Sequence, residues 1–365
     1  MNPFKFGSVV DGEHFTNRIA EIARINSVLE SKNHLIIISP RRFGKTSLIL
    51  KTVRKMDRPV IYLDMQLMTS TNDFAAQLLK KVHKLYPYKK FQQFLKNFKI
   101  TPAITLNVQT NNINITFHPQ SAPEVVIEDV LRLLEDISSD DNKLIVIIDE
   151  FQEIKRLDTW LEQKLRAIIQ HHKKVNFVFL GSKESMMREI FEKKKSPFYN
   201  FGFLMPIGEI PKEEFMEFLT SRFIEITDNA PAISEEIIKI TNSHPYYTQC
   251  LAFSVWEVIS KQRGNEAPVQ TAIAEMVKIH DNDFERLWTT LTKTEQKIML
   301  GLVEGDLLPL SEAFRQRYEL GANSTTFSAL KKLEEKGMVI KLDSKYEIDD
   351  PIFSKWLIGR RVGEW

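Results

Sequence analysis

The sequence predicts an α/β fold in which a doubly wound parallel sheet is followed by a helical lid and a C-terminal winged helix. Up to about residue 210, apolar runs rich in Ile and Val alternate with amphipathic helical segments, a pattern typical of strand–helix–strand units. From Pro211 onward the pattern becomes all-helical. Residues 286–365 then combine helical segments with two short strand segments, in the order of a winged helix.

One strand-to-helix turn carries a phosphate-binding pattern. Residues 39–47 read SPRRFGKTS and follow the apolar run 35–38. In the template G-x-x-x-x-G-K-[ST], Gly44 lets backbone N–H groups close around phosphate, Lys45 reaches the β- and γ-phosphates, and Thr46 ligates Mg²⁺. The N terminus of the following helix adds partial positive charge. The residues expected to contact ATP at this P-loop are Pro40, Arg41, Arg42, Phe43, Gly44, Lys45, Thr46 and Ser47.

Ser39 stands where the template has its first glycine. The tight turn after the strand must therefore be made by a residue with a Cβ, so we expect some backbone strain at Ser39. The alternative is a chance G-K-T at a strand-to-helix turn, because short motifs can match by chance. A second motif argues against chance.

The second motif is a buried strand that ends in two carboxylates. Residues 144–148 read LIVII, which is typical of a strand buried on both faces of a parallel sheet. Asp149 and Glu150 follow at its carboxyl end, where ligands bind in open α/β sheets. We expect Asp149 to hold Mg²⁺ through water and Glu150 to orient and deprotonate the attacking water. The alternative is an acidic strand end without function.

Composition sets broad limits on the class of protein. A length of 365 residues suggests two or three domains. The net charge of +2, from 50 basic and 48 acidic residues, gives no global attraction to nucleic acid or membrane. Cys250 is the single cysteine, which suits a reducing compartment, and no apolar run reaches the roughly 20 residues that span a bilayer. With no signal-peptide pattern at the start, we expect a cytoplasmic protein.

The other elements of the ATPase domain, expected over 31–210, follow from apolar periodicity. An N-terminal segment and helix are expected over 1–30. Residues 104–108 and 113–117 alternate in polarity and predict an inserted β-hairpin at about 101–119, with Asn111 and Asn112 between its strands. The remaining segments expected are helices over 17–31, 45–56, 73–86, 123–138, 160–172 and 184–195, and strands over 59–64, 174–182 and 203–207.

Two further positions in this domain are candidates for nucleotide contact. Arg18, at the start of the first helix, could reach adenine or phosphate, or could be a surface residue. Ser182 ends the strand 174–182, which we expect between the P-loop strand and the strand of the second motif. Ser182 is therefore the candidate sensor of the γ-phosphate, with Lys183 as the second choice. The alternative for Ser182 is a plain turn or helix cap.

The helical lid is expected over 211–285. Its helices are predicted over 212–226, 234–241 and 243–263. His244 and Pro245 lie at the start of the third helix and could approach the nucleotide from the lid side. The alternative is that His244 is only a turn residue.

The winged helix is expected over 286–365. Its third helix, 323–336, should place Phe327, Leu330 and Leu333 inward, and Gly337 should end it. The exposed start of this helix has few base-reaching side chains, and its lysines are followed by glutamates. Since a DNA-reading helix needs flanking cations, the pattern favours packing against protein over contact with DNA.

Several stretches together resemble the archaeal-type ATPase family, a STAND-like branch of the AAA+-related P-loop NTPases. They are SPRRFGKTSL, LIVIIDE, the FxxR of residues 15–18, SHPYY at 243–247 and the closing stretch from Tyr346 to Trp356. The resemblance covers nearly the whole chain. It implies a sheet with a central P-loop strand, a helical lid and a C-terminal winged helix.

The same resemblance implies specific roles for site residues. ATP and Mg²⁺ would bind at Lys45, Thr46 and Asp149, with Glu150 catalytic, while Arg41 and Arg42 match the paired arginines of such loops. Relatives often carry Gly-Arg where this chain has Asn200-Phe201. If that arginine is a finger in relatives, hydrolysis here would be slow, since a supplied arginine contributes on the order of 10³-fold or more.

These predictions lead to one functional hypothesis and two alternatives. The hypothesis is an ATP-dependent switch, in which ATP binds between the α/β domain and the lid and repositions the winged helix for a protein partner or self-association. The first alternative is a DNA-binding initiator or transposition-type ATPase. The second is a binding module that nucleotide stabilises without turnover. No membrane partner is expected.

Overall fold

The computed structural model describes residues 1–16, 18–31, 33–107, 112–118, 120–261, 266–305, 307–342 and 345–362. The chain forms two compact units: one spans Arg18–Ile207, and the other combines Met1–Asn17 with Gly208–Trp365. The segment expected as one N-terminal part over 1–30 is thus divided between the units. Among the described helices, each is too short or too polar to span a lipid bilayer.

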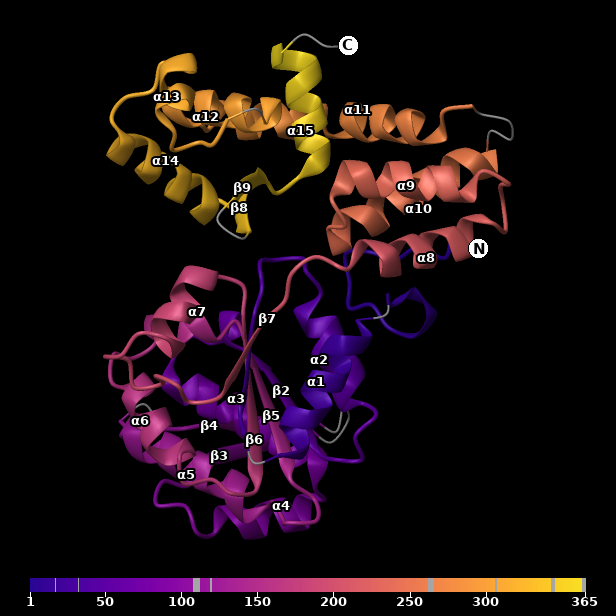
Figure 1. Ribbon diagram of the computed structural model, residues 1–365. Coiled ribbons are helices and arrows are strands. Elements are labelled where there is room, and N and C mark those ends of the chain that lie inside the picture. The colour runs from indigo at the N-terminus through magenta and orange to yellow at the C-terminus, as the bar shows by residue number, and fades with distance from the viewer. Residues whose placement is uncertain are drawn as a thin grey trace. The chain divides into compact units, whose positions relative to one another are not determined.

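Within the described residues, the first unit contains a five-stranded parallel sheet in the order β2-β5-β6-β1-β7 (Figure 1). β6 separates β1 from β5, so the strand expected between the P-loop strand and the strand of the second motif lies there. Every residue of β1, β5 and β6 is buried, which explains their continuous apolar runs. The predicted α/β fold class is confirmed. The strands are β1 (Leu35–Ile38), β2 (Val60–Asp64), β5 (Leu144–Asp149), β6 (Val175–Gly181) and β7 (Phe203–Pro206).

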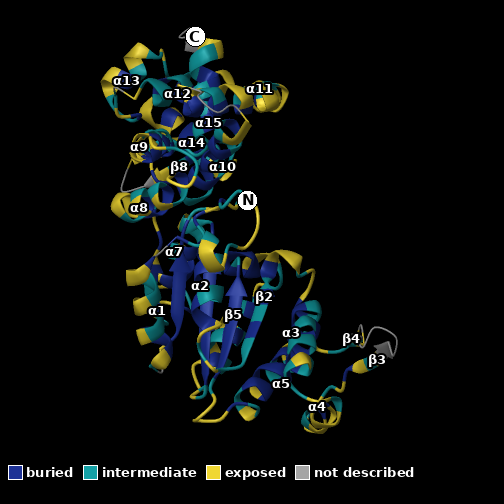
Figure 2. Ribbon diagram, turned by 90° about the vertical axis from the view of Figure 1, so that its right-hand side faces the viewer, coloured by how far each residue is buried: buried dark blue, intermediate teal, exposed yellow. Residues whose placement is uncertain are grey.

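Helices cover both faces of this sheet, and Figure 2 shows the strands buried between them. The helices α1 and α2 contact each other on one side, whereas α3, α5, α6 and α7 cover the other (Figure 1). The loop 39–44 connects the carboxyl end of β1 to the start of α2. The bounds are α1 (Ile19–Glu30), α2 (Lys45–Val53), α3 (Thr71–Leu85), α5 (Pro123–Asp136), α6 (Leu161–Ile169) and α7 (Glu184–Phe191), with a short 3₁₀ turn η2 (Met65–Leu67) after β2.

The predicted hairpin is present as β3 (Ala103–Asn107) and β4 (Asn112–Thr116). Asn112 begins the second strand, and Asn111, expected in the turn, lies outside the described residues. Two further elements, α4 (Tyr88–Leu95) and the 3₁₀ helix η3 (Phe151–Arg156), were not predicted from the sequence. Both are too short to show a clear apolar period, because each offers only about two turns to establish it.

The second unit begins with the helices that correspond to the lid. Helix α9 starts earlier than the predicted residue 234, because Pro231 suits the first turn of a helix. Helix α11 was not predicted, and the expected boundary between 285 and 286 falls inside it. The helices are α8 (Lys212–Phe223), α9 (Ala230–Thr241), α10 (Pro245–Lys261) and α11 (Pro268–Thr289).

The first residues of the chain pack into this lid. The Phe4 side chain is 3% exposed and lies 5.0 Å from Phe223 and 6.0 Å from Trp256, measured between ring centroids. The Asn2 amide donates to the carbonyl oxygen of Phe253 at 3.0 Å. A 3₁₀ turn, η1 (Gly12–His14), follows. The N-terminal residues are therefore an integral part of the hydrophobic core of the second unit.

The predicted winged helix is confirmed in the C-terminal part of the second unit. Thr292 and Glu295 form a capping box at the start of α12, and Gly337, at φ 69°, ends α14. Its elements are α12 (Lys293–Glu304), α13 (Glu312–Arg317), α14 (Asn323–Glu335), β8 (Val339–Leu342), β9 (Lys345–Ile348), α15 (Pro351–Leu357) and the π-helical η4 (Ile358–Val362).

For one residue of α14, the prediction that its side chain points into the core is wrong. Leu330 and Leu333 are fully buried, but Phe327 is 49% exposed. Thr326 is buried instead, because positions 326, 330 and 333 share one face of the helix at spacings of four and three, and position 327 is turned about 100° away from 326.

Phe4 offers a test of how strongly the N-terminal residues stabilise the second unit. We expect Phe4→Ala to lower the free energy of unfolding by about 3 kcal/mol, because it empties a buried aromatic site. Phe327→Ala is the matched control and should change it by less than about 1 kcal/mol, since the ring is half exposed. Urea denaturation of the three proteins measures both values. Equal midpoints for the two variants would contradict the packing of Phe4.

A histidine at the start of β1 makes stability depend on pH. Burial, together with the charges of His172 and Arg166, lowers the pKa of His34 to about 4. Its Nδ1 accepts the backbone N–H of Phe177 at 3.2 Å, so the neutral ring is the form that fits. The folded chain therefore resists protonation of His34, whereas the unfolded chain binds the proton with a pKa near 6.5. This contribution is complete above pH 6.5 and is lost as the pH falls toward 4.

We expect His34→Gln to remove this part of the pH dependence, because the amide oxygen can accept the same N–H. Between pH 7 and 5 the wild type should lose about 2 kcal/mol more of unfolding free energy than the variant. Thermal denaturation at a series of pH values measures the difference, with the exposed His118→Gln as control. Parallel curves for wild type and His34→Gln would show that His34 is not responsible.

Candidate functional site

The turn between β1 and α2 has the backbone of a phosphate-binding loop. Gly44 has φ 84° and Arg42 has φ 66°, so both lie in the left-handed region. The expected strain at Ser39 is wrong, because its φ is not positive. Ser39 is buried instead, and its N–H donates to the carbonyl oxygen of Gly181 at 3.2 Å, which continues the pairing of β1 with β6. The strained residue of this loop is Arg42, because a residue with a Cβ is unfavourable in the left-handed region. This backbone strain costs about 1–3 kcal/mol.

Arg18 contacts this loop through its buried side chain. Its side chain is 3% exposed, so the alternative of a surface residue is wrong. Its Nη2 donates to the backbone oxygen of Phe43 at 3.2 Å, and its Nη1 pairs with Glu21 at 2.8 Å. The Phe43 ring is fully buried. The two residues therefore anchor the loop, and Phe43 can offer a ligand only its backbone.

Lys45 is a buried cation at the first position of α2. Its Nζ lies 4.0 Å from Oε1 of Glu150, and Lys45 as a whole is 6% exposed. Burial lowers the pKa of Lys45, while the charges of Glu150 and Asp149 act in the opposite direction. An ammonium held this deep is stabilised by any further negative charge that reaches it, and phosphate oxygens are such a charge.

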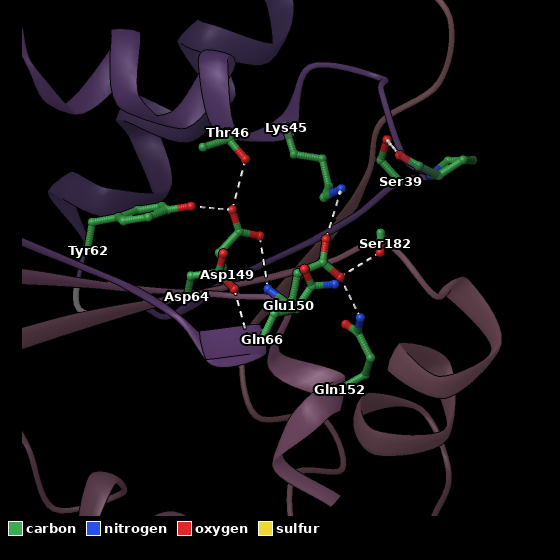
Figure 3. A network of polar contacts seen from close by, with 11 residues as sticks. Ser39, Lys45, Thr46, Tyr62, Asp64, Gln66, Asp149, Glu150, Gln152 and Ser182 are labelled. Atoms are coloured by element: carbon green, nitrogen blue, oxygen red, sulfur yellow. Dashed lines mark hydrogen bonds and ion pairs between the residues drawn. The ribbon is translucent and has the colours of Figure 1, made fainter. Parts of the chain in front are cut away.

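Asp149 joins the second motif to the P-loop (Figure 3). Its Oδ2 accepts the Thr46 hydroxyl at 2.8 Å and the Tyr62 hydroxyl at 2.7 Å, and its Oδ1 accepts the N–H of Glu150 at 2.9 Å. Burial, and then the charge of Asp149, raise the pKa of Tyr62, so its phenol stays protonated and remains a donor. The structure thus brings the two residues expected to hold Mg²⁺ into direct contact.

Glu150 occupies a left-handed position, φ 50°, at the end of β5. Its Oε2 accepts the Ser182 hydroxyl and the Gln152 amide, each at 2.5 Å (Figure 3). Burial acts to raise the pKa of Glu150, but the charge of Lys45 and these two hydrogen bonds outweigh it and hold the pKa below its usual value. The carboxylate is therefore ionised at neutral pH, as a general base must be.

The structure separates the two sensor candidates. Ser182 is buried and bonded to Glu150. Lys183 pairs instead with Glu153, at 2.9 Å, and its side chain is 38% exposed. Of the two, Ser182 is the residue that lies within the polar network.

Some residues predicted to contact the nucleotide are exposed on the loop or belong to the second unit. Arg41 and Arg42 are exposed on the loop, and the charge of Arg41 contributes to the low pKa of Glu150. His244 and Pro245 belong to the second unit, where His244 Nδ1 accepts the N–H of Tyr246 and its Nε2 lies 3.8 Å from Asp349. Their approach to a nucleotide stays a prediction.

Three polar residues of the site were missed by the sequence analysis: Tyr62, Asp64 and Gln152. Asp64 lies beside Asp149 in the register of β2 and β5, and its Oδ1 accepts the N–H of Gln66 at 2.9 Å. Burial raises the pKa of Asp64. The place of Asp64 in the sequence could have indicated it as a site residue. Asp64 ends a strand that neighbours the strand of Asp149, and the carboxyl ends of both strands lie on the same edge of the sheet.

The residues fit a magnesium ion bound together with a nucleotide. Mg²⁺ prefers hard oxygen ligands and commonly combines one or two protein oxygens with phosphate and water. Thr46 Oγ1 at the start of α2 and Asp149 Oδ2 at the end of β5 supply such oxygens. Nothing lies within 4 Å of the position that a Cβ on Gly44 would take, so the loop is open on that side.

Two protein-family models match the chain. One, described as an ATPase domain predominantly from Archaea, matches residues 15–249, more than half of the 365 residues. The other, described as a probable winged helix domain, matches residues 282–359. Curated proteins gave no match.

Solved structures share the fold at low sequence identity. The Walker-type ATPase PABY2304 of Pyrococcus abyssi is 17% identical with a TM-score of 0.69, over 97% of this chain and 99% of that one. The ORC1 protein of Aeropyrum pernix in complex with DNA is 14% identical with a TM-score of 0.52, over 96% and 94%. The ADP form of the ORC2 protein of the same organism is 17% identical with a TM-score of 0.50, over 97% and 94%.

The bond from Tyr62 to Asp149 leads to a test of the metal site. We expect Tyr62→Phe to weaken Mg²⁺-dependent ADP binding by about tenfold, because Asp149 loses a donor that fixes its orientation. ADP binding in the presence of EDTA should stay unchanged. Calorimetric titration with and without Mg²⁺ measures both, and Tyr199→Phe, at an exposed tyrosine, is the control. An equal loss with and without Mg²⁺ would assign Tyr62 to the nucleotide pocket in general and not to the metal.

Proposed function

Because the chain belongs to the family of ATPase domains found predominantly in Archaea, we propose that it is a Mg²⁺-dependent ATPase that acts as a nucleotide-controlled switch for a protein partner. The observation that supports turnover is the state of Glu150. It is ionised, it is held by Ser182 and Gln152, and it lies 4.0 Å from Lys45. A site that only stores nucleotide has no need of an aligned base.

The proposed reaction transfers the γ-phosphoryl group of ATP to water. The water gives a proton to the Glu150 carboxylate, and its oxygen forms a bond to phosphorus while the bond to the bridging oxygen of ADP breaks. Lys45 neutralises charge on the β- and γ-phosphates, and the backbone N–H groups of the loop and of the α2 N terminus bind them. Mg²⁺ held at Thr46 and Asp149 would supply further charge neutralisation.

We expect slow turnover without a partner, because Asn200-Phe201 stands where relatives often carry Gly-Arg. Asn200 has φ 52°, and its N–H donates to the carbonyl oxygen of Phe191 at 3.1 Å. A stimulating arginine would then come from another molecule. This dependence suits a switch, since hydrolysis would be fast only in the assembled state.

A protein partner is favoured over DNA by the surface of α14. Phe327 is 49% exposed there, and an exposed aromatic ring suits an apolar contact with protein. A DNA-binding role is the second candidate, because the ORC1 relative of this fold was solved in complex with DNA. That role predicts binding with a steep dependence on salt.

We expect ATP hydrolysis by the purified chain with Mg²⁺, and its loss in two variants for different reasons. Lys45→Ala should abolish nucleotide binding, since it removes the charge that meets the phosphates. Glu150→Gln should keep binding but lower kcat by at least about 100-fold, because it removes the base. Phosphate release and fluorescent-nucleotide binding separate the two effects.

Exposed residues of the same unit give matched controls, Lys55→Ala for the first variant and Glu30→Gln for the second. ATP binding without hydrolysis in the wild type would leave the nucleotide-stabilised binding module. Stimulation by duplex DNA would favour the initiator role. Identical small-angle scattering with ATP, with ADP and without nucleotide would refute the switch.

A further inference from the structure

We propose that Gln152 is a positioning residue that fixes the Glu150 carboxylate in the orientation required of a general base. This inference rests on the proposed function and assigns a role to a residue outside the phosphate-binding motifs. Gln152 lies in the first turn of η3, directly after the strand that carries Asp149. It is fully buried, at 0% exposed.

The two oxygens of Glu150 have different surroundings (Figure 3). Oε2 accepts hydrogen bonds from Gln152 Nε2 and from the Ser182 hydroxyl, each at 2.5 Å. Oε1 faces Lys45 Nζ at 4.0 Å. Two donors, one from η3 and one from the turn after β6, therefore fix the plane of the carboxylate and leave Oε1 as the oxygen that can accept a proton from water.

The orientation of the Gln152 amide follows from its surroundings. Turning the amide over would place its Oε1 against the ionised carboxylate of Glu150, which is repulsive, so Nε2 must face Glu150. Its Oε1 then points toward Gly181. A Cβ built on Gly181 would lie 2.7 Å from this oxygen and 2.3 Å from the Met187 side chain, so a larger residue there would force these side chains to move.

This arrangement is not the one that maximises stability. Gln152 Oε1 is buried and has no hydrogen-bond partner among the described residues. An unpaired buried acceptor is destabilising, and such a group calls for a reason other than packing. The reason is that the amide donates a hydrogen bond to Glu150 and so orients its carboxylate. An apolar side chain of the same length would fill the site without the unpaired oxygen.

Gln152→Met is therefore the decisive variant, because it keeps the length of the side chain and removes both the donor and the unpaired oxygen. The first measurement is the pKa of Glu150 in the nucleotide-free chain, from ¹³C NMR of the labelled carboxyl, assigned with Glu150→Gln. Losing a donor to the ionised form should raise this pKa by about one unit, a tenfold change in the protonation equilibrium. The melting temperature should be unchanged or higher.

The second measurement is turnover. Gln152→Met should lower kcat about tenfold with ATP affinity unchanged, and the acidic limb of the kcat profile should move to higher pH with the pKa of Glu150. Gln92→Met, an exposed glutamine in α4, is the matched control and should change none of these quantities.

The two readouts separate failure of this inference from failure of the proposed function. A wild type that never hydrolyses ATP would refute the proposed ATPase, while the pKa measurement still decides the role of Gln152. A pKa of Glu150 that is the same in wild type and Gln152→Met would overturn the positioning role. A lower melting temperature with unchanged kcat would assign Gln152 to packing alone and would overturn it as well.

Discussion

The ion pair between Lys45 and Glu150 is the interaction on which the candidate site depends. Burial alone would favour the neutral form of each group, because both lose hydration. Lys45 keeps Glu150 ionised, and Glu150 with Asp149 offsets the loss of hydration at Lys45. Removal of Lys45 leaves the buried Glu150 charge without this cation, whereas removal of Glu150 leaves Asp149 to offset the charge of Lys45. A phosphate chain brought to Lys45 would share this cation, so the hydrogen bonds to Glu150 matter most when nucleotide is present.

The parts of the site that could be predicted are those determined locally. A fully apolar run predicts a buried parallel strand, and its carboxyl end predicts where Lys45 and Asp149 meet. The contacts of Tyr62 and Gln152 could not be predicted. Tyr62 is an ordinary strand residue in the sequence, and its partner lies 87 positions away. The direction of Gln152 depends on the 3₁₀ turn η3, which leaves no periodic signal.

The errors in the fold have a similar origin. Helix α11 was not predicted, and residues 278–283 within it are largely polar, so they give little apolar periodicity. In the structure Asp281 accepts the indole N–H of Trp356 at 2.8 Å and pairs with Arg360, so tertiary contacts stabilise a helix that composition does not favour. The prediction that Phe327 points inward follows its spacing of three from Leu330, whereas in the structure Thr326 is buried and Phe327 is exposed.

Backbone strain and charge are linked at this site. Glu150 and Arg42 are non-glycine residues in the left-handed region, each at a cost of about 1–3 kcal/mol. Such positions persist only where the surroundings determine them. At Glu150 the backbone N–H bonds to Asp149, and the side chain is held by Ser182, Gln152 and Lys45. The turn directs the carboxylate out of the strand toward the P-loop. The contacts that keep Glu150 charged are thus the same contacts that offset its strained backbone, so its protonation state and its position are set together.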